Sequence, residues 1–217
     1  MVLNFLKRRR DLTAFDIYGS VAEASRQPEL FLQMGVPDTI SGRFDMLIAH
    51  AVLVLRRLNR VDPSRAEEAQ FRSQGFSDVL FKDLDRALRD TGLSDRKAPK
   101  KLKLLATVYL GRGKAFGEAL DQADQAALTE ALKRNTGGVV FLADGTEAAL
   151  PDDADNGSEG SDPGRENSTT DYEALAMYLT AVDAKLATLT DDEVLQGALA
   201  WPQAGALAKS HAEGVGA

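Results

Sequence analysis

The sequence predicts an all-α protein: a single-domain bundle of about six to eight helices with one flexible acidic insertion. Alanine and leucine are abundant and only 6% of the 217 residues are aromatic, a balance that favours helices over sheets. Apolar residues recur at helical spacing in one segment after another. The segment 35–58 combines a turn, a capped start and an almost wholly apolar helix, which is typical of a helix at the centre of a bundle.

This central helix is expected to begin between Asp38 and Phe44. Pro37 fixes its own φ, and Asp38 and Ser41 carry oxygens that can cap exposed backbone N–H groups. Gly42 allows a tight approach of the chain just before the apolar run. The apolar positions that share one face are Phe44, Leu47, Ile48, Ala51, Leu55 and Leu58, and those on the other are Met46, Leu53 and Val54. A helix that is apolar on both faces is normally buried.

Helices are also expected on either side of this one. The first runs over residues 11–27, and a short turn of helix follows at 30–34. Asp62 and Pro63 have the pattern of an N-cap and a first-turn proline, so another helix should run from there to Asp90. These segments form the first half of the predicted bundle.

Beyond residue 90 the helical pattern continues. Gly92 is expected to end the preceding helix in a left-handed conformation, and the basic segment 94–103 is a connection. The next helix reaches Leu120, and Gly113 within it predicts a close contact with a neighbouring helix. A further helix is expected at 126–135.

The domain organisation follows from shifts in composition. We expect a basic N-terminal tail over 1–10 and a helical domain over 11–150, which ends with a short extended element at 137–142. Residues 151–170 are acidic, polar and rich in Gly, Ser and Pro, which predicts a flexible linker. Two short helices at 171–202 should dock on the same domain, because an isolated pair buries little surface. Thr190 and Glu193 have the spacing of a capping box at the start of the second helix. The last part, 203–217, is expected to fray.

Composition bounds the functional classes. The absence of cysteine excludes a disulfide, a thiolate metal site and a cysteine nucleophile. A net charge of −7 argues against binding to DNA, although local basic runs remain. No apolar run reaches the roughly 18 residues of a membrane-spanning helix, so we expect a cytoplasmic protein. The basic start, Lys7 to Arg10, is either a solvated tail or a peripheral contact with the inner face of an anionic membrane.

No catalytic, metal or cofactor site emerges from the sequence. His50 has no partner base or ligand one helical turn away, so we place it on a less buried stripe of the central helix; His211, in the tail, receives no role. The glycine-rich run 111–117 lies inside a predicted helix and lacks the Walker spacing. The acidic residues between Asp78 and Asp90 alternate with basic ones, as solvated ion pairs do.

One basic cluster stands out in this acidic chain. It could meet ribosomal RNA, lipid head groups or an acidic partner, or it could be a solvated loop at a helix start. Its members are Arg96, Lys97, Lys100, Lys101 and Lys103.

Ordered motifs along the chain carry a family resemblance. They are LQMGVPDT at 32–39, GRFDML at 42–47 with the apolar run to Leu58, FKDLDRALRD at 81–90, YLGR at 109–112 and LKRN at 132–135. Through them residues 12–136 resemble the ubiquinol-cytochrome c chaperone family, the assembly factors of respiratory complex III in alpha-proteobacteria and mitochondria. A weaker similarity continues from Tyr172 and at Trp201-Pro202.

The resemblance implies a non-catalytic helical protein without cofactors that helps newly made cytochrome b mature and enter complex III. Its implied partners are cytochrome b, a small helical assembly partner and the ribosome that makes cytochrome b. The charged residues of the matching motifs then form either a partner-binding surface or internal ion pairs. They are Arg43, Asp45, Arg56, Arg57, Asp83, Asp85, Arg86, Arg89 and Arg112.

Two other functional classes stay open at this point. A helical enzyme acting on an apolar, isoprenoid-like substrate would need paired carboxylates with a metal between them. A general ribosome or RNA adaptor would need only the basic patches, and its binding would weaken steeply with salt.

Overall fold

The computed structural model describes residues 2–90, 92, 94–136 and 170–215, and within these ranges the secondary structure is helical, without strands. The all-α fold class is thereby confirmed. The expected extended element at 137–142 and nearly all of the expected linker at 151–170 lie outside the described residues. The helices are α1 (Val2–Ala24), α2 (Pro28–Leu32), α3 (Ile40–Leu58), the 3₁₀ helix η1 (Pro63–Arg65), α4 (Ala66–Asp90), α5 (Ala98–Asp121), α6 (Gln125–Asn135), α7 (Tyr172–Ala187), α8 (Asp191–Leu195) and α9 (Ala204–Val215).

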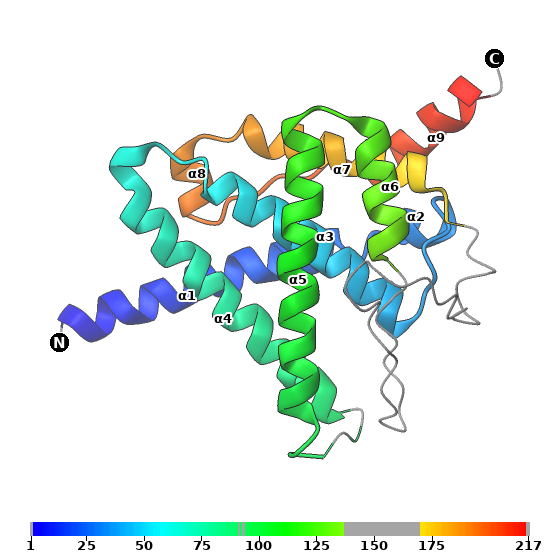
Figure 1. Ribbon diagram of the computed structural model, residues 1–217. Coiled ribbons are helices and arrows are strands. Elements are labelled where there is room, and N and C mark those ends of the chain that lie inside the picture. The colour runs from blue at the N-terminus through cyan, green and yellow to red at the C-terminus, as the bar shows by residue number, and fades with distance from the viewer. Residues whose placement is uncertain (1, 91, 93, 137–169, 216–217) are drawn as a thin grey trace.

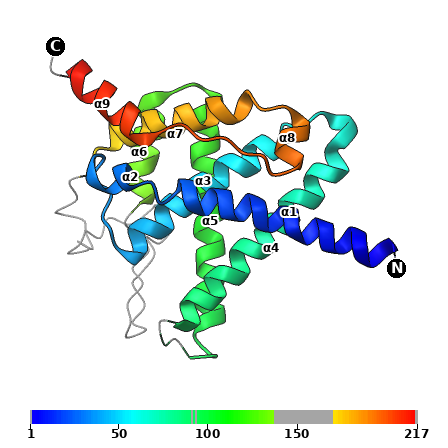
Figure 2. The same ribbon diagram turned by 180° about the vertical axis from the view of Figure 1, so that it is seen from behind.

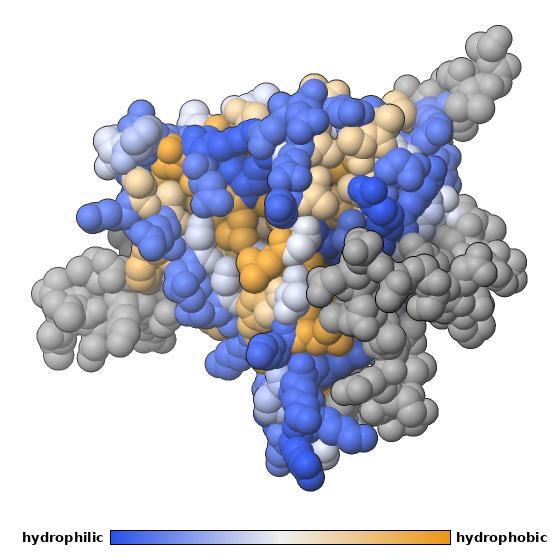
Figure 3. Space-filling model, viewed as in Figure 1, coloured by the Kyte–Doolittle hydropathy of each residue, from blue (hydrophilic) through white to orange (hydrophobic). Residues whose placement is uncertain are grey.

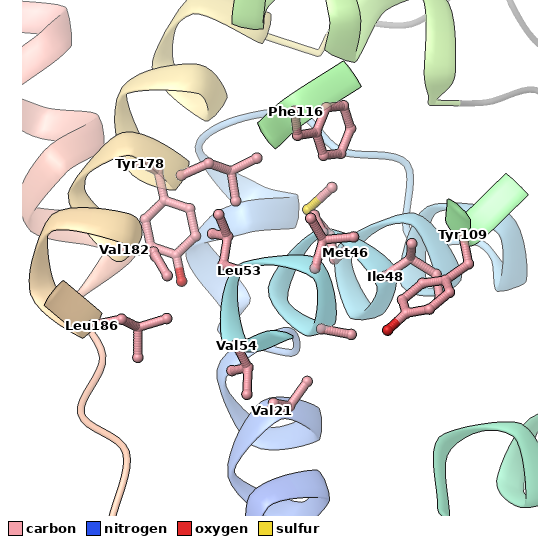
Figure 4. Close-up of a cluster of buried hydrophobic side chains, with 14 of the residues drawn as sticks. Val21, Met46, Ile48, Leu53, Val54, Tyr109, Phe116, Tyr178, Val182 and Leu186 are labelled. Atoms are coloured by element: carbon pink, nitrogen blue, oxygen red, sulfur yellow. The ribbon is translucent and has the colours of Figure 1, made fainter. Parts of the chain in front are cut away.

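Helix α3 lies at the centre of the bundle, as expected (Figure 1). It contacts α1, α4, α5, α7 and α8, and thirteen of its nineteen residues are buried. Figure 4 shows how side chains from several helices converge on it: Val21 from α1, Tyr109 and Phe116 from α5, and Tyr178 and Val182 from α7. The expectation from apolar spacing therefore gives the correct position of this helix in the core.

The start of α3 confirms one detail and corrects another. A Cβ atom on Gly42 would lie 2.0 Å from the carbonyl oxygen of Pro37, so only glycine fits this tight approach. The N-cap, however, is Thr39, whose side chain accepts a hydrogen bond of 3.1 Å from the Gly42 N–H. Asp38 is not the cap; it pairs with Arg43 instead.

Other capping predictions are confirmed. The Asp62 side chain accepts from the Ser64 N–H at the start of η1, and Gly92 has a φ of 84° after α4. Thr190 and Glu193 form a complete capping box at the start of α8. These local patterns need only neighbouring residues, which is why they can be recognised from the sequence.

The two ends of the chain differ from the expectation. Helix α1 begins at Val2, so the expected basic tail is the first part of a long helix that extends beyond the bundle (Figure 2). At the other end, α9 occupies Ala204–Val215, where we expected a frayed tail. Its His211 Nε2 lies 3.4 Å from Asp171 Oδ2 at the start of α7.

Gly113 is also corrected. A Cβ atom there would meet only Val52 Cγ2 at 3.9 Å, an ordinary van der Waals contact. The expected close helix contact is therefore absent at this glycine. Close approach occurs instead at Gly75, where an added Cβ would lie 3.3 Å from the Cβ of Ala14 on α1.

Candidate functional site: buried polar links and exposed charged surfaces

A chain of hydrogen bonds crosses the core from α3 to the C-terminal segment. His50 is fully buried, with Nδ1 2.7 Å from the Met46 carbonyl oxygen and Nε2 2.8 Å from the Tyr178 hydroxyl. Gln27 Nε2 donates to the same hydroxyl (3.0 Å) and to the Pro202 carbonyl (3.3 Å). The expectation of a less buried stripe for His50 is therefore wrong.

The acceptors in this chain of hydrogen bonds determine which atoms carry the protons. The Met46 carbonyl can only accept, so Nδ1 of His50 carries the proton and Nε2 accepts from the Tyr178 hydroxyl. Burial lowers the pKa of His50 to about 4 and raises that of Tyr178. At neutral pH the two form a neutral, saturated hydrogen-bonded pair, which leaves His50 no free ring nitrogen for proton transfer.

Residues just after α8 tie into the same region. The Ala204 N–H donates to Gln27 Oε1 (2.9 Å), and Trp201 Nε1 donates to Ser20 Oγ (2.8 Å). The Trp201 ring lies 5.6 Å from the His50 ring, centroid to centroid. Residues of α1, α3, α7 and the segment after α8 thus share one partly buried polar cluster.

Arg112 and Asp45 form a buried ion pair between α5 and α3. Nη2 of Arg112 lies 2.6 Å from Oδ1 of Asp45, and the guanidinium carbon is 5.6 Å from the centre of the Phe44 ring. Arg112 also donates to the carbonyl of Asn135 at the end of α6. Both motif charges therefore act inside the bundle, where they join three helices.

Arg56 links the end of α3 to two other helices. Its Nε donates to Asp183 of α7 (3.0 Å), Nη1 to the Gly117 carbonyl of α5 (3.1 Å) and Nη2 to Asp121 (2.6 Å). The hydrogen bond from Arg56 lowers the pKa of the Asp121 carboxyl. The side chain is mostly buried and its donors are occupied by internal acceptors.

Arg57 is held in a similar way on the other side of α3. Its Nε donates to the Leu186 carbonyl (3.1 Å), and Nη2 donates to the Leu189 carbonyl and to Asp191 Oδ1, both at 2.7 Å. The guanidinium thus satisfies one carbonyl in the last turn of α7 and one in the turn that follows. Arg57 therefore fixes the turn between α7 and α8.

The remaining motif charges lie at the surface. Arg43 pairs with Asp38 (2.6 Å) near the start of α3, and Arg89 pairs with Asp85 (2.8 Å) one turn earlier on α4. Arg43 holds the pKa of the Asp38 carboxyl below its usual range by donating a hydrogen bond. Arg89 also pairs with Asp95 in the connection after α4, so these surface charges are satisfied by residues close to them in the sequence.

Asp83 and Arg86 also lie on α4. Asp83 accepts a hydrogen bond from the Tyr18 hydroxyl of α1, and burial together with this bond raises the pKa of Tyr18. Arg86 is exposed. The nine motif charges are thus spread over several faces and do not converge on one site.

The basic cluster lies where α4 and α5 project furthest from the body of the bundle. This end of the helix pair forms the hydrophilic projection at the lower edge of Figure 3. Four of its members are exposed, and partial burial lowers the pKa of the fifth, Lys101. The members are Arg96, Lys97, Lys100, Lys101 and Lys103.

The described part of the chain offers no grouping of three or more His, Asp or Glu side chains that could hold a metal ion. Among the same residues, no helix is long and apolar enough to cross a membrane.

The sequence of the bundle matches a known family. The model of the ubiquinol-cytochrome C chaperone family matches residues 32–201, which is most of the chain and includes α3 to α8. The chain belongs to this family. Among solved structures, the crystal structure of the Cbp3 homolog from Brucella abortus has a TM-score of 0.70 and 27% sequence identity, and the alignment covers 94% of this chain and 98% of that chain. No curated protein matches the sequence.

The chaperone-family match contains the His50–Tyr178 hydrogen bond and the Asp45–Arg112 ion pair. Asp45, His50, Arg112 and Tyr178 lie within it, whereas α1 and α9 lie outside residues 32–201. Reasoning from the sequence missed the role of Tyr178, because its partner His50 is 128 residues away. The available signal was a tyrosine on the buried face of a helix, since a buried hydroxyl needs a hydrogen-bond partner.

Proposed function

We propose that this protein is a non-catalytic assembly chaperone that assists the maturation of cytochrome b and its insertion into ubiquinol-cytochrome c reductase. One observation carries the proposal: the chaperone-family match extends from residue 32 to Trp201, through every helix that packs on α3 except α1. The Brucella abortus Cbp3 homolog adds support, because it aligns over nearly the full length of both chains.

The chemistry of the buried groups agrees with a non-catalytic role. His50 and Tyr178 use their polar atoms on each other and on Met46 and Gln27. Asp45 and Arg112 neutralise each other away from solvent. Because each group holds helices together, the polar residues of the core serve stability.

The expected partners differ in chemistry. Newly made cytochrome b is an apolar client, and a small helical assembly partner is a second protein candidate. The basic cluster at the end of the α4–α5 pair suits phosphate-rich ribosomal RNA. Lys7 to Arg10, in the extension of α1, suit the anionic inner face of a membrane.

Deletion of the gene in the source organism tests the proposal. We expect the deletion strain to lose cytochrome b and complex III, and a plasmid copy to restore both. Cytochrome b measured by difference spectroscopy and complex III measured by native electrophoresis are the readouts. Normal amounts of both in the deletion strain would refute the function.

Ribosome contact has its own test. Reversing the charge of Lys97, Lys100 and Lys103 should release the protein from sedimented ribosomes, whereas reversing the exposed Lys114 on α5 should not. Binding of the native protein should also fall steeply with rising salt, because phosphate contacts release counterions. Salt-insensitive binding would contradict a contact through this cluster.

A further inference from the structure

Helices α1 and α4 enclose a groove at the edge of the bundle. The two helices cross there, and α1 continues past the crossing (Figure 1 and Figure 2). The groove has a volume of about 300 Å³. It is lined by Ala14 and Phe15 of α1 and by Phe71, Arg72, Gly75, Asp78, Val79 and Lys82 of α4. The close approach of Gly75 to Ala14 forms part of its wall.

The two phenylalanines of this groove remain exposed. Phe15 is 52% exposed and Phe71 40%, and Leu12, one turn before Phe15, is 57% exposed. Exposed apolar side chains that lie next to one another in this way mark an interaction surface. On α4 the lining positions recur every three or four residues from Phe71 to Lys82, about 17 Å along the axis. A groove of this spacing accepts the ridge of another helix.

The charge of the groove is opposite to that of the whole protein. Its lining contains two cations, Arg72 and Lys82, and one carboxylate, Asp78, in a chain of net charge −7. Arg72 Nη2 lies 3.6 Å from Glu68, but that carboxylate also accepts from Arg65 at 2.9 Å. Nε and Nη1 of Arg72 have no hydrogen-bond partner among the described residues. These two nitrogens are buried, and the guanidinium carbon lies 6.0 Å from the centre of the Phe71 ring, so Glu68 alone of the described carboxylates compensates the charge of Arg72, at 3.6 Å.

Lys82 gives the groove a second cation at its other end. No described side chain forms an ion pair with Lys82; the lining carboxylate, Asp78, accepts instead from Gln74 (2.7 Å). Arg72 and Lys82 are ten residues apart on one helix, about 15 Å along its axis. A single lipid phosphate reaches one of them, whereas a helix that lies along the groove can present a carboxylate to each.

We infer that the α1–α4 groove binds an apolar helix of the client, with acidic residues at the ends of the apolar ridge facing Arg72 and Lys82. The apolar ridge packs on Phe15, Phe71 and Val79. This inference rests on the proposed function, because it takes the client to be cytochrome b. A second copy of the chain is a poor occupant, since two-fold pairing of this face would bring its cations together.

Photo-cross-linking in the source organism tests the occupant directly. Full-length protein carries a benzoylphenylalanine in place of Phe15, or in place of Leu110 as the control, which is 70% exposed on α5 and outside the groove. We expect an adduct that an antibody to cytochrome b detects from position 15 only. An adduct of two copies of this chain, or an adduct with lipid alone, would overturn the inference.

Substitutions measure what the groove contributes to the binding of cytochrome b. Phe71→Asp and Lys82→Glu should each lower the cytochrome b that copurifies by about tenfold or more, because each replaces a proposed contact with an unfavourable charge. The matched controls Leu110→Asp and Lys114→Glu should leave it unchanged. Circular dichroism melts should place all four variants near the native protein, because the substituted side chains are exposed or partly exposed.

The deletion strain distinguishes a failure of the groove assignment from a failure of the proposed function. If deletion lowers cytochrome b while both groove variants bind it normally, the groove assignment fails and the proposed function stands. If deletion leaves cytochrome b unchanged, the proposed function fails and the groove assignment falls with it.

Discussion

Arg112 Nη2 lies 2.6 Å from Asp45 Oδ1 inside the bundle, where the two side chains are 1% and 3% exposed. Either charge alone would be costly at this depth, because the protein interior solvates ions poorly. As a pair they join α3 to α5, and through the Asn135 carbonyl they also fix the end of α6. The pair therefore holds together helices that are far apart in the sequence.

Breaking this pair on one side should be strongly destabilising. We expect Asp45→Leu to lower the free energy of unfolding by about 3–5 kcal/mol, because Arg112 would remain buried without its counter-charge. The double variant Asp45→Leu, Arg112→Met should lose less than the single variant, since no charge is left buried. Urea unfolding of the native protein, both single variants and the double variant measures the coupling; strictly additive losses would contradict a direct interaction.

His50 predicts a pH dependence of stability. Its pKa is about 4 in the folded protein and about 6.5 when unfolded, so between these values the unfolded state binds a proton that the folded state does not. The stabilising effect of the neutral ring is complete above pH 6.5 and is lost as the pH falls towards 4. The full loss is about 3 kcal/mol.

The matched variant for this test is His50→Gln, which keeps polar atoms in the position but does not titrate. Urea unfolding from pH 7.5 to 4.5 should show a steeper loss in the native protein than in the variant, because the carboxylates titrate in both. Parallel curves would mean that His50 does not contribute to the pH dependence of stability.

Arg57 should prove structural. Arg57→Met removes donors to the Leu186 and Leu189 carbonyls and to Asp191, which should lower the free energy of unfolding by roughly 3 kcal/mol. The control is Arg86→Met on the exposed side of α4, for which we expect a change within about 0.5 kcal/mol. A stable Arg57→Met protein that no longer binds cytochrome b would instead identify Arg57 as a contact residue.

Two glycines offer a test of backbone packing. Gly42→Ala would place a Cβ 2.0 Å from the Pro37 carbonyl oxygen, so the turn before α3 must shift and the melting temperature should fall. Gly111→Ala on α5 meets nothing within 4 Å and should stabilise the helix by about 0.5–1 kcal/mol. For a chain of this size that is a rise of roughly 1–4 °C in a calorimetric scan. A rise with Gly42→Ala would contradict the contact.

Local features of this fold could be predicted from the sequence, and long-range ones could not. The Thr190–Glu193 capping box and the special position of Gly42 depend on residues within a few positions, so they were recognisable. The length of α1 was underestimated, because the run of basic residues from Lys7 to Arg10 has no apolar periodicity to mark a helix.

For the candidate site, too, the sequence predicts some features and not others. The motif charges were recognised as a set, but the sequence does not tell which are buried. The sequence could not show that Arg112 and Arg57 are internal, because their partners, Asp45 and Asp191, lie 67 and 134 positions away along the chain. No helical spacing connects such residues, and only the packing of α3 against α5 and α8 brings them together.

The hydrogen-bonded chain from His50 through Tyr178 and Gln27 to Pro202 also has a consequence for the order of folding. Helix α3 cannot cover its buried face, nor His50 find its hydroxyl partner, until the ribosome has synthesised α7 and the segment that follows it. Contacts of such large sequence separation form late, because they close long loops. A nascent or truncated chain that ends before Tyr172 would keep the apolar surface of α3 uncovered, which makes it a substrate for proteases and an aggregation hazard.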